Sequence, residues 1–320
     1  MQRIGVVTAG GDAPGMNAAI RSIVRVATFH GLKVMGIERG YAGLVEGQIR
    51  PLGPRSVSGI INRGGTILKT ARCEAIKTNQ GIQKAKNTLK TNKIDGLIVI
   101  GGDGSLKAAS ELHEAIGLSI VGVPATIDND VAGTDTTIGF DTAVNTALFT
   151  IDRIRDTATS HERVFVVEVM GRKRGFLALE VGLAEGAEFI LIPEIKHNLQ
   201  DISKKLRQGR SKGKTSEIII MAEGAGNSAT VVEQIRKETG YDIRLTVLGH
   251  AQRGGSPTAR SRILANQFGA YALELLLQGA KKNMVGIKGQ RIVSVDLDYA
   301  WKEKKELDMS RYRLAEILSS

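Results

Sequence analysis

The sequence contains a single cysteine, Cys73, among its 320 residues. One cysteine cannot form an intrachain disulfide, nor can it supply a cysteine-based zinc site. No apolar run approaches the roughly 18 residues that a membrane-spanning helix needs. The first residues, MQRIGVVTAGGD, lack the apolar core of a secretion signal and already have the pattern of a strand. We therefore expect a soluble, cytoplasmic protein with no membrane partner.

Aromatic residues are also scarce, at 4% of the sequence, although the chain is basic, with a net charge of +11. A basic surface can indicate nucleic-acid binding. Here stacking side chains are few and no basic tract is long, so a nucleic-acid partner is the weakest interpretation and we do not expect one. Many arginines lie singly in separate motifs, which favours an anionic small molecule as the ligand.

The sequence is rich in short apolar runs that alternate with helical patterns. Several runs are nearly continuous in Val, Ile and Leu, which is typical of strands covered on both faces in a parallel sheet. The alternation predicts repeated βαβ units in an α/β protein. The runs are residues 4–10, 33–37, 96–102, 120–125, 164–171, 189–194 and 217–224. Residues 301–320 have the pattern of an amphipathic helix.

Glycines cluster where the expected strands end, and the first cluster is TAGGDAPGMNAAIR at residues 8–21. Gly10 and Gly11 follow a strand, and a helix is expected to begin near Gly15 or Met16. Glycines let backbone N–H groups approach a phosphate, and the helix N-terminus adds partial positive charge. The spacing fits neither the Rossmann fingerprint nor the P-loop. Taken alone, this turn fits a structural role equally well.

The second cluster, IGGDGSLKAA at residues 100–109, places Asp103 inside an anion-binding turn. A bare carboxylate would repel a triphosphate, whereas a bridging Mg²⁺ takes oxygens from both groups. The alternative is that Asp103 caps the helix that follows. The loop and the acid together favour a nucleotide–metal site.

The third stretch, VGVPATIDND, covers residues 121–130. We expect Pro124 to end a strand and Thr126, Asp128, Asn129 and Asp130 to crowd its tip. An acid here could accept a proton from an attacking hydroxyl or help to hold a metal. The alternative is an Asx-rich turn. Spacing alone does not distinguish these possibilities.

Basic residues in glycine-rich or motif-like settings suggest a second, phosphorylated ligand, because arginine binds phosphate in a bidentate manner. They are Arg72, Arg163, Arg172, Arg244, His250 and Arg253. With two phosphate loops and a candidate proton acceptor, the residues predict a Mg²⁺-dependent phosphoryl-transfer enzyme with a phosphorylated acceptor.

The motifs TAGGDAPGMNAAIR, GGTILKTAR, IGGDGS, TIDND, IRDTATSHER, VVEVMGR, AEG and VLGHAQRGGSP occur in this order along the chain. In this combination the sequence resembles the bacterial ATP-dependent 6-phosphofructokinases over essentially its whole length. The resemblance implies two similar three-layer α/β/α domains with mostly parallel sheets. A larger ATP-binding domain would comprise residues 1–138 and 251–300. A smaller domain, binding fructose 6-phosphate, would comprise 139–250 and 301–320.

The resemblance also implies roles for individual residues. Asp128 would be the base at the sugar 1-hydroxyl, with Thr126, Asp130 and Arg172 as the other catalytic residues, and Asp103 would hold Mg²⁺. The residues expected to contact ATP are Gly11, Arg72, Cys73, Gly102, Asp103, Gly104 and Ser105. The residues expected to bind the sugar phosphate are Thr126, Ile127, Asp128, Arg163, Met170, Gly171, Arg172, Glu223, Arg244, His250 and Arg253.

The family resemblance further implies a homotetramer in which Arg163 and Arg244 reach the site of a neighbouring subunit. ADP or phosphoenolpyruvate would act as effectors between subunits. The matching effector positions are Arg21, Arg25, Arg155, Gly186, Ala187, Glu188, Lys212 and Lys214. Pro54 stands where an effector-binding arginine is common in the family.

The sequence departs from the family pattern near the reaction centre. Gly104 favours ATP, because pyrophosphate-dependent relatives usually carry Asp there. Ala125, Ala108, Phe176 and Ser261 replace residues common in close relatives. They leave open a divergent paralogue that uses another donor or sugar, such as pyrophosphate, tagatose 6-phosphate or sedoheptulose 7-phosphate. A non-catalytic regulatory subunit is a further alternative.

Overall fold

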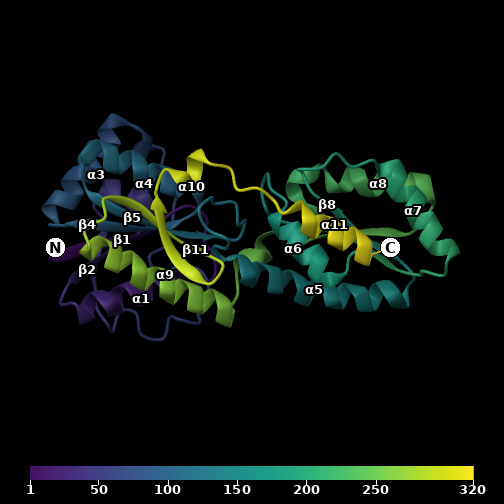
Figure 1. Ribbon diagram of the computed structural model, residues 1–320, viewed down its shortest axis with the longest axis horizontal. Helices are drawn as coiled ribbons and strands as arrows, with labels where there is room; N and C mark the ends of the chain where they lie inside the picture. The colour runs from purple at the N-terminus through teal and green to yellow at the C-terminus, as the bar shows by residue number, and fades with distance from the viewer. Residues whose placement is uncertain (320) are drawn as a thin grey trace. The chain divides into compact units, whose positions relative to one another are not determined.

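The chain forms two units of α/β structure in a computed structural model that describes residues 1–319 (Figure 1). Unit 1 comprises Met1–Thr142 and Arg253–Lys305, and unit 2 comprises Ala143–Gln252 and the segment from Glu306 onward. The chain therefore leaves unit 1, completes most of unit 2, returns to unit 1 and ends in unit 2.

The boundaries between the units lie a few residues later than those expected at 138, 250 and 300. Side-chain bonds explain two of these shifts. Thr142 Oγ1 donates to Ser261 Oγ at 2.8 Å, which attaches the start of a long helix to unit 1. Lys305 Nζ donates to Asn129 Oδ1 at 2.9 Å, which keeps the chain in unit 1 beyond residue 300.

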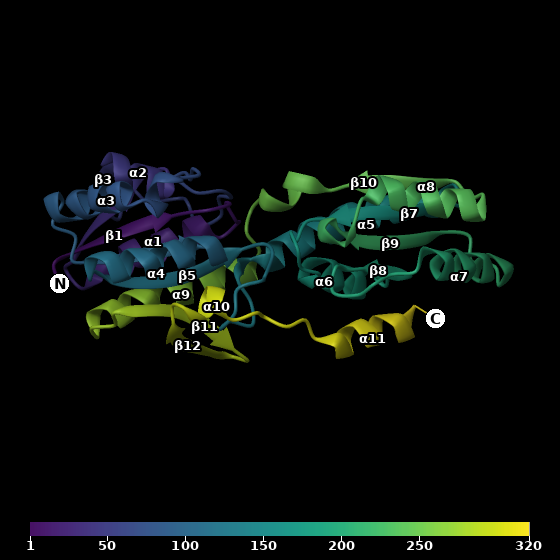
Figure 2. The same ribbon diagram turned by 90° about the horizontal axis from the view of Figure 1, so that it is seen from above.

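Unit 1 is built on an eight-stranded, mostly parallel sheet. In sheet order its strands are β12 (Arg291–Asp296), β11 (Lys282–Lys288), β5 (Ser119–Thr126), β4 (Gly96–Gly101), β1 (Arg3–Thr8), β2 (Lys33–Ile37) and β3 (Ile49–Leu52), with β6 (Ile138–Gly139) beside the end of β5. The pairs β11–β12 and β2–β3 are antiparallel. The central strands β1 and β4 are mostly apolar and buried because helices cover both faces of the sheet (Figure 2).

Two groups of helices sandwich this sheet. On one face, α1 (Met16–Phe29) packs against α9 (Ala259–Leu277), so a helix from each part of unit 1 closes the same layer (Figure 1). The helices of the other face are α2 (Gly40–Glu46), α3 (Asn79–Thr91), α4 (Asp103–Ile116) and α10 (Tyr299–Lys302). This three-layer arrangement buries the side chains of β4 and β5 almost completely, while the outer strands β3 and β12 stay partly exposed.

Unit 2 repeats the plan with a smaller sheet, in which all four strands are parallel. In sheet order they are β10 (Ile243–Val247), β7 (Val164–Val169), β9 (Glu217–Ala222) and β8 (Phe189–Leu191). One face is covered by α7 (Leu199–Ser211) and α8 (Ser228–Thr239), and the other by α5 (Phe140–Ser160) and α6 (Phe176–Glu185). The terminal helix α11 (Met309–Leu318) packs beside α6. The prediction of an α/β fold with mostly parallel sheets in two domains is confirmed.

Some local expectations were wrong. Pro124 does not end a strand, because β5 continues to Thr126. The proline lies between the residues that pair with β11 and those that pair with β6, where its missing N–H costs little. The tail is not one helix either, since α10 and α11 are separated by residues 303–308. Within residues 1–319, none of the helices has both the length and the apolar character needed to span a membrane.

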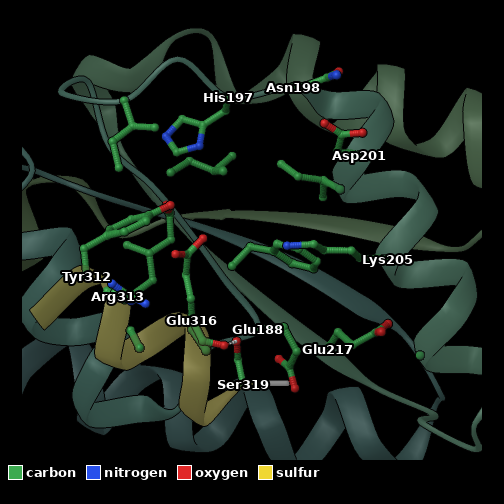
Figure 3. A pocket seen from close by; sticks show the side chains of 18 of the residues that line it. Glu188, His197, Asn198, Asp201, Lys205, Glu217, Tyr312, Arg313, Glu316 and Ser319 are labelled. Atoms are coloured by element: carbon green, nitrogen blue, oxygen red, sulfur yellow. Dashed lines mark hydrogen bonds between the residues drawn. The ribbon is translucent and has the colours of Figure 1, made fainter. Parts of the chain in front are cut away.

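A cavity of about 770 Å³ lies in unit 2 between α7, β8 and α11 (Figure 3). At one end, Glu217 at the start of β9 is 2% exposed, and its Oε2 has no hydrogen-bond partner among the described residues. Burial, reinforced by the nearby Glu188 carboxylate, raises the pKa of Glu217 to about 7. At the other end, His197 Nε2 accepts the Ile192 N–H at 2.9 Å, and burial lowers the pKa of this imidazole.

The raised pKa of Glu217 predicts a pH-dependent loss of stability. Below the ordinary glutamate pKa of 4.5 the carboxyl is protonated in the folded and unfolded states, and its stabilising effect is fully present. As the pH rises to about 7 the unfolded chain releases this proton first, so the free energy of unfolding falls. In the parent protein, Glu217 should lower the free energy of unfolding by about 2 kcal/mol between pH 5 and pH 8. Glu217→Gln should abolish this decrease.

Urea unfolding midpoints at the two pH values would measure this difference. Glu233→Gln, on the exposed side of α8, is the matched control and should keep the parental pH dependence. Identical pH dependence in Glu217→Gln and the parent protein would contradict the prediction.

Candidate active site

Three neighbouring strands of unit 1 end at the same edge of the sheet. β5, β4 and β1 are adjacent and parallel, and their register places Thr8 opposite Ile100 and Gly101 opposite Pro124. Their carboxyl ends therefore bring together the glycine-rich segment after β1, the Gly102–Ser105 turn and the Thr126–Asp130 turn. In open α/β sheets this edge is where ligands bind.

The segment after β1 makes close backbone contacts that require glycine. Gly10 has φ +81°, and a Cβ there would lie 2.7 Å from Ser105 Oγ. A Cβ on Gly101 would lie 2.6 Å from the Ala9 carbonyl oxygen. α1 then begins at Met16, as predicted. The glycines of the first two clusters thus let the β1 and β4 turns pack directly against each other.

The Gly102–Ser105 turn opens helix α4. Gly102 occupies the N-cap position without a side-chain cap bond, and Asp103 is the first helical residue. The N-cap residue of α4 is therefore Gly102 and not Asp103. A Cβ on Gly104 would meet nothing within 4 Å, so the start of the helix faces open space. A helix N-terminus in this setting favours an anion.

The Thr126–Asp130 turn is held by Thr126 and Asn129. The Asp128 N–H donates to Thr126 Oγ1 at 3.2 Å, and Asn129 has φ +54°. Asn129 Oδ1 accepts the Thr137 N–H at 3.1 Å, while Thr137 Oγ1 donates to the Thr126 carbonyl at 2.7 Å. Asp128 and Ile127 are fully buried, and Thr126 Oγ1 lies 3.3 Å from Asp128 Oδ2. A buried carboxylate thus follows β5, the neighbour of β4, which leads into the turn with Asp103.

The segment that contains Arg72 and Cys73 is fixed to the turn after β1. Thr70 Oγ1 donates to the Gly10 carbonyl at 2.7 Å, and Thr8 Oγ1 donates to the Lys69 carbonyl at 3.0 Å. Arg72 is exposed, while Cys73 is partly buried against the core of this unit. The residues expected to contact ATP therefore lie around the ends of β1 and β4.

Arg253 belongs to unit 1, although the resemblance groups it with the sugar-binding residues of unit 2. Its Nη1 donates to the Asp12 carbonyl at 3.3 Å, and the guanidinium occupies the space where a Gly11 side chain would stand. This contact gives Gly11 a packing role in addition to its expected role at the nucleotide.

A second group of expected residues meets at the carboxyl edge of the unit 2 sheet. Met170, Gly171 and Arg172 follow β7, Glu223 follows β9, and His250 lies in the 3₁₀ turn after β10. The Arg172 N–H donates to Glu223 Oε1 at 2.6 Å.

The loop after β7 adopts unusual backbone angles, and neighbouring groups hold it in place. Gly171 has φ +131° and Arg172 has φ +53°. Sequence reasoning missed Gln252, which is fully buried and whose Oε1 accepts the Met170 N–H at 2.9 Å. The signal was present, because Gln252 stands inside the quoted motif VLGHAQRGGSP.

Arg163 and Arg244 do not join this group. Arg163 precedes β7 and Arg244 is near the start of β10, so both lie at the amino edge of the sheet. Six residues of β7 separate the two edges, which is roughly 20 Å of extended chain. Both guanidinium groups bind Asp242, with Nε–O distances of 2.7 Å for Arg163 and 2.9 Å for Arg244. These two ion pairs lower the pKa of the Asp242 carboxyl.

The expected effector residues are divided between the units. Arg21 and Arg25 lie on α1 in unit 1, and the others belong to unit 2. Arg155 Nε binds Glu185 Oε1 at 2.7 Å, and the Gly186–Glu188 run links α6 to β8. Ala187, Glu188, Lys212 and Lys214 line the cavity shown in Figure 3. Lys214 Nζ donates to the Ser319 carbonyl at 3.1 Å, so this lysine holds the terminal helix.

The donor set is compatible with Mg²⁺ bound mainly by phosphate. Across residues 1–319 there is no group of three or more His, Cys, Asp or Glu side chains that could hold a metal. Mg²⁺ commonly uses one or two carboxylates, with substrate phosphates and water completing its octahedron. Asp103, partly exposed at the first turn of α4, fits that requirement.

Comparisons with known proteins agree with this geometry. A sequence model of the phosphofructokinase family matches residues 3–276. The ATP-dependent 6-phosphofructokinases of Brevibacillus brevis and Halothermothrix orenii are 54% and 53% identical, and each match covers 100% of both chains. Saccharomyces cerevisiae phosphofructokinase superposes with a TM-score of 0.88 at 35% identity, over 99% of this chain and 46% of the yeast chain.

A pyrophosphate-dependent phosphofructokinase from Marinobacter aquaeolei superposes with a TM-score of 0.85, over 97% of this chain and 86% of its own. Its sequence is 22% identical, so this likeness shows only that the two proteins share a fold. The family-model match covers most of the chain, and the bacterial relatives match along its full length. The chain therefore belongs to the phosphofructokinase family.

Proposed function

We propose that this protein transfers the γ-phosphoryl group of ATP to the 1-hydroxyl of D-fructose 6-phosphate, forming ADP and fructose 1,6-bisphosphate in glycolysis. The names of its full-length relatives support the donor and the reaction class. The observation that carries the proposal is the adjacency of β4 and β5. It puts the buried carboxylate of Asp128 beside a helix N-terminus suited to phosphate.

The chemistry assigned to this edge is an in-line transfer. The sugar 1-oxygen bonds to the γ-phosphorus as the bond to the β–γ bridging oxygen breaks, and Asp128 takes the hydroxyl proton. The N-terminus of α4 stabilises negative charge on the nucleotide phosphates. Asp103 would hold Mg²⁺, which supplies charge neutralisation. Thr126 fixes the turn that presents Asp128 and Asp130.

The acceptor residues come from the carboxyl edge of the unit 2 sheet. We assign the binding of the sugar phosphate to Met170, Gly171, Arg172, Glu223, His250 and Arg253. The 2.6 Å bond from the Arg172 N–H to Glu223 supports a preformed loop, because it fixes a residue in the left-handed region.

The placement of Arg163 and Arg244 supports a homotetramer with shared sites. They lie at the opposite edge of the sheet from Arg172, so one chain does not bring all these cations to one sugar phosphate. β10 is an edge strand, and its Leu245 and Val247 side chains are exposed. An exposed apolar edge strand is a surface suited to contact with another copy.

The structure favours ATP over the alternative donors. Gly104 faces open space, which leaves room for the α-phosphate region. Two of the departures have a packing explanation. Ser261 accepts a bond from Thr142 and is buried, and Phe176 is the buried first residue of α6. Neither residue gives a reason for a different donor.

ADP or phosphoenolpyruvate as effector stays a prediction, as does the cytoplasmic location. The effector set keeps Arg155, Glu188, Lys212 and Lys214, but three of these already serve the fold. Arg155 binds Glu185, Glu188 accepts the Ile218 N–H at 2.8 Å, and Lys214 binds Ser319. An anionic effector at Lys214 would compete with the terminal helix for this ammonium group.

Asp128→Asn tests the catalytic base. The amide keeps the shape of the side chain but accepts no proton, so kcat should fall by about 10²–10⁴-fold with smaller changes in both KM values. Steady-state kinetics measure the split, and Asp152→Asn on the exposed face of α5 is the control. Near-normal turnover would remove Asp128 from this role.

Gly104→Asp tests the donor site. The new side chain enters open space at a helix N-terminus, so thermal stability should be kept. Its carboxylate would repel the nucleotide phosphates and raise the KM for ATP by roughly tenfold or more. Gly104→Ala adds only a methyl group and is the matched control. Equal KM values for ATP in the two variants would contradict the assignment.

Mixing two inactive variants tests the shared site. Asp128→Asn and Arg244→Ser should each be nearly inactive alone. After dissociation and reassembly together, hybrid tetramers should regain activity, because some sites then combine Asp128 from one copy with Arg244 from another. No activity beyond the sum of the separate variants would argue for sites contained in one chain.

A further inference from the structure

Lys305 is attached to the Thr126–Asp130 turn, although it lies 176 residues after Asn129 in the sequence. It belongs to the non-helical segment between α10 and α11 and is the last residue of unit 1. Its Nζ donates to Asn129 Oδ1 and to the Asp135 carbonyl, both at 2.9 Å. None of the motifs in the sequence points to this residue.

The turn that Lys305 contacts needs external support. Asn129 has φ +54°, a left-handed conformation that is unfavourable for residues with a side chain, although asparagine tolerates it better than most. This residue stands between Asp128 and Asp130, so its backbone angles decide where both carboxylates point. A relaxation of Asn129 to an ordinary conformation would rotate the chain on either side of it.

The Asn129 side chain lies at the centre of a small network of hydrogen bonds. Asn129 Oδ1 accepts the Thr137 N–H at 3.1 Å as well as the Lys305 ammonium, and Asn129 Nδ2 donates to the Asp135 carbonyl at 3.3 Å. Lys305 therefore links Asn129 to Asp135 across the 129–137 loop. Replacing Lys305 would keep the bonds from Asn129 to Thr137 and Asp135. The loop would stay folded, but the Asn129 side chain would be held less firmly.

The ammonium group, and not only its carbon chain, suits this position. Lysine carries three donors, and two oxygens are here within hydrogen-bond distance. Burial lowers the pKa of Lys305 to about 8, while Asp135 and Asp130 oppose this shift. The group is therefore mostly charged at neutral pH. The ammonium group of the nearby Lys302 instead donates to Asp298 Oδ2 at 2.6 Å.

We propose that Lys305 is a positioning residue for phosphoryl transfer, which fixes the left-handed turn at Asn129 and thereby the orientation of the Asp128 carboxylate. This inference rests on the proposed role of Asp128 as the base. The proposed effect of Lys305 passes through its bond to Asn129 Oδ1. Loss of Lys305 would misplace the Asp128 carboxylate, and catalytic rates are sensitive to the position of a base.

Kinetics of Lys305→Met, with Lys304→Met as the control, test the proposal. Lys304 is the exposed neighbour of Lys305 and should be replaceable without effect. We expect Lys305→Met to lower kcat by roughly ten- to a hundredfold while the KM values for ATP and fructose 6-phosphate change less than about threefold. Lys305→Arg, which keeps charge and donors, should recover part of the loss.

A double variant separates positioning from a general loss of structure. If Lys305 acts through Asp128, adding Lys305→Met to Asp128→Asn should lower the residual kcat much less than it lowers that of the parent. Losses that multiply would overturn the proposal. So would a kcat for Lys305→Met within twofold of the Lys304→Met control.

A further variant keeps the test valid if Lys305→Met does not fold. Lys305→Gln retains a neutral donor and should still lower kcat at least fivefold. The same value as in the control would overturn the proposal. The role of Asp128 as the base is tested separately. It would be refuted by near-normal turnover of Asp128→Asn, whatever the Lys305 variants show.

Discussion

The chemistry proposed for this protein depends on the parallel register of three neighbouring strands, β1, β4 and β5. Because they are adjacent and parallel, segments separated by about a hundred residues in the chain end at one edge of a sheet. Glycines then allow the turns to touch, as at Gly10 and Gly101. The roles proposed for α4 and the buried Asp128 depend on this adjacency.

Unit 2 uses the same principle with a different outcome. Its four parallel strands gather Arg172, Glu223 and His250 at the carboxyl edge and leave Arg163 and Arg244 at the amino edge. In the proposed function the carboxyl edge binds the sugar phosphate and the amino edge meets another copy of the chain. Within the single chain, ion pairs with Asp242 hold Arg163 and Arg244 at the surface.

Sequence patterns predicted what is local and missed what is distant. Apolar runs located most of the parallel strands but missed β10 and β11, and the glycine clusters located turns, because both signals lie within about ten residues. Pro124 was misjudged because its tolerance depends on which strands flank β5. Gln252 and Lys305 escaped notice as supports because their partners, Met170 and Asn129, are 82 and 176 residues away. The resemblance supplied roles for Asp128 and Asp130 that spacing alone left open.

The discontinuity of unit 1 has a consequence for synthesis on the ribosome. After Thr142 the ribosome must translate all of Ala143–Gln252 before α9 and β11 emerge. At usual translation rates this interval lasts on the order of ten seconds. During that time β5 has an open edge where β11 will pair, and the apolar face that α9 will cover stays uncovered. The nascent N-terminal half therefore exposes apolar surface during this interval, and most of unit 2 is synthesised before unit 1 is complete.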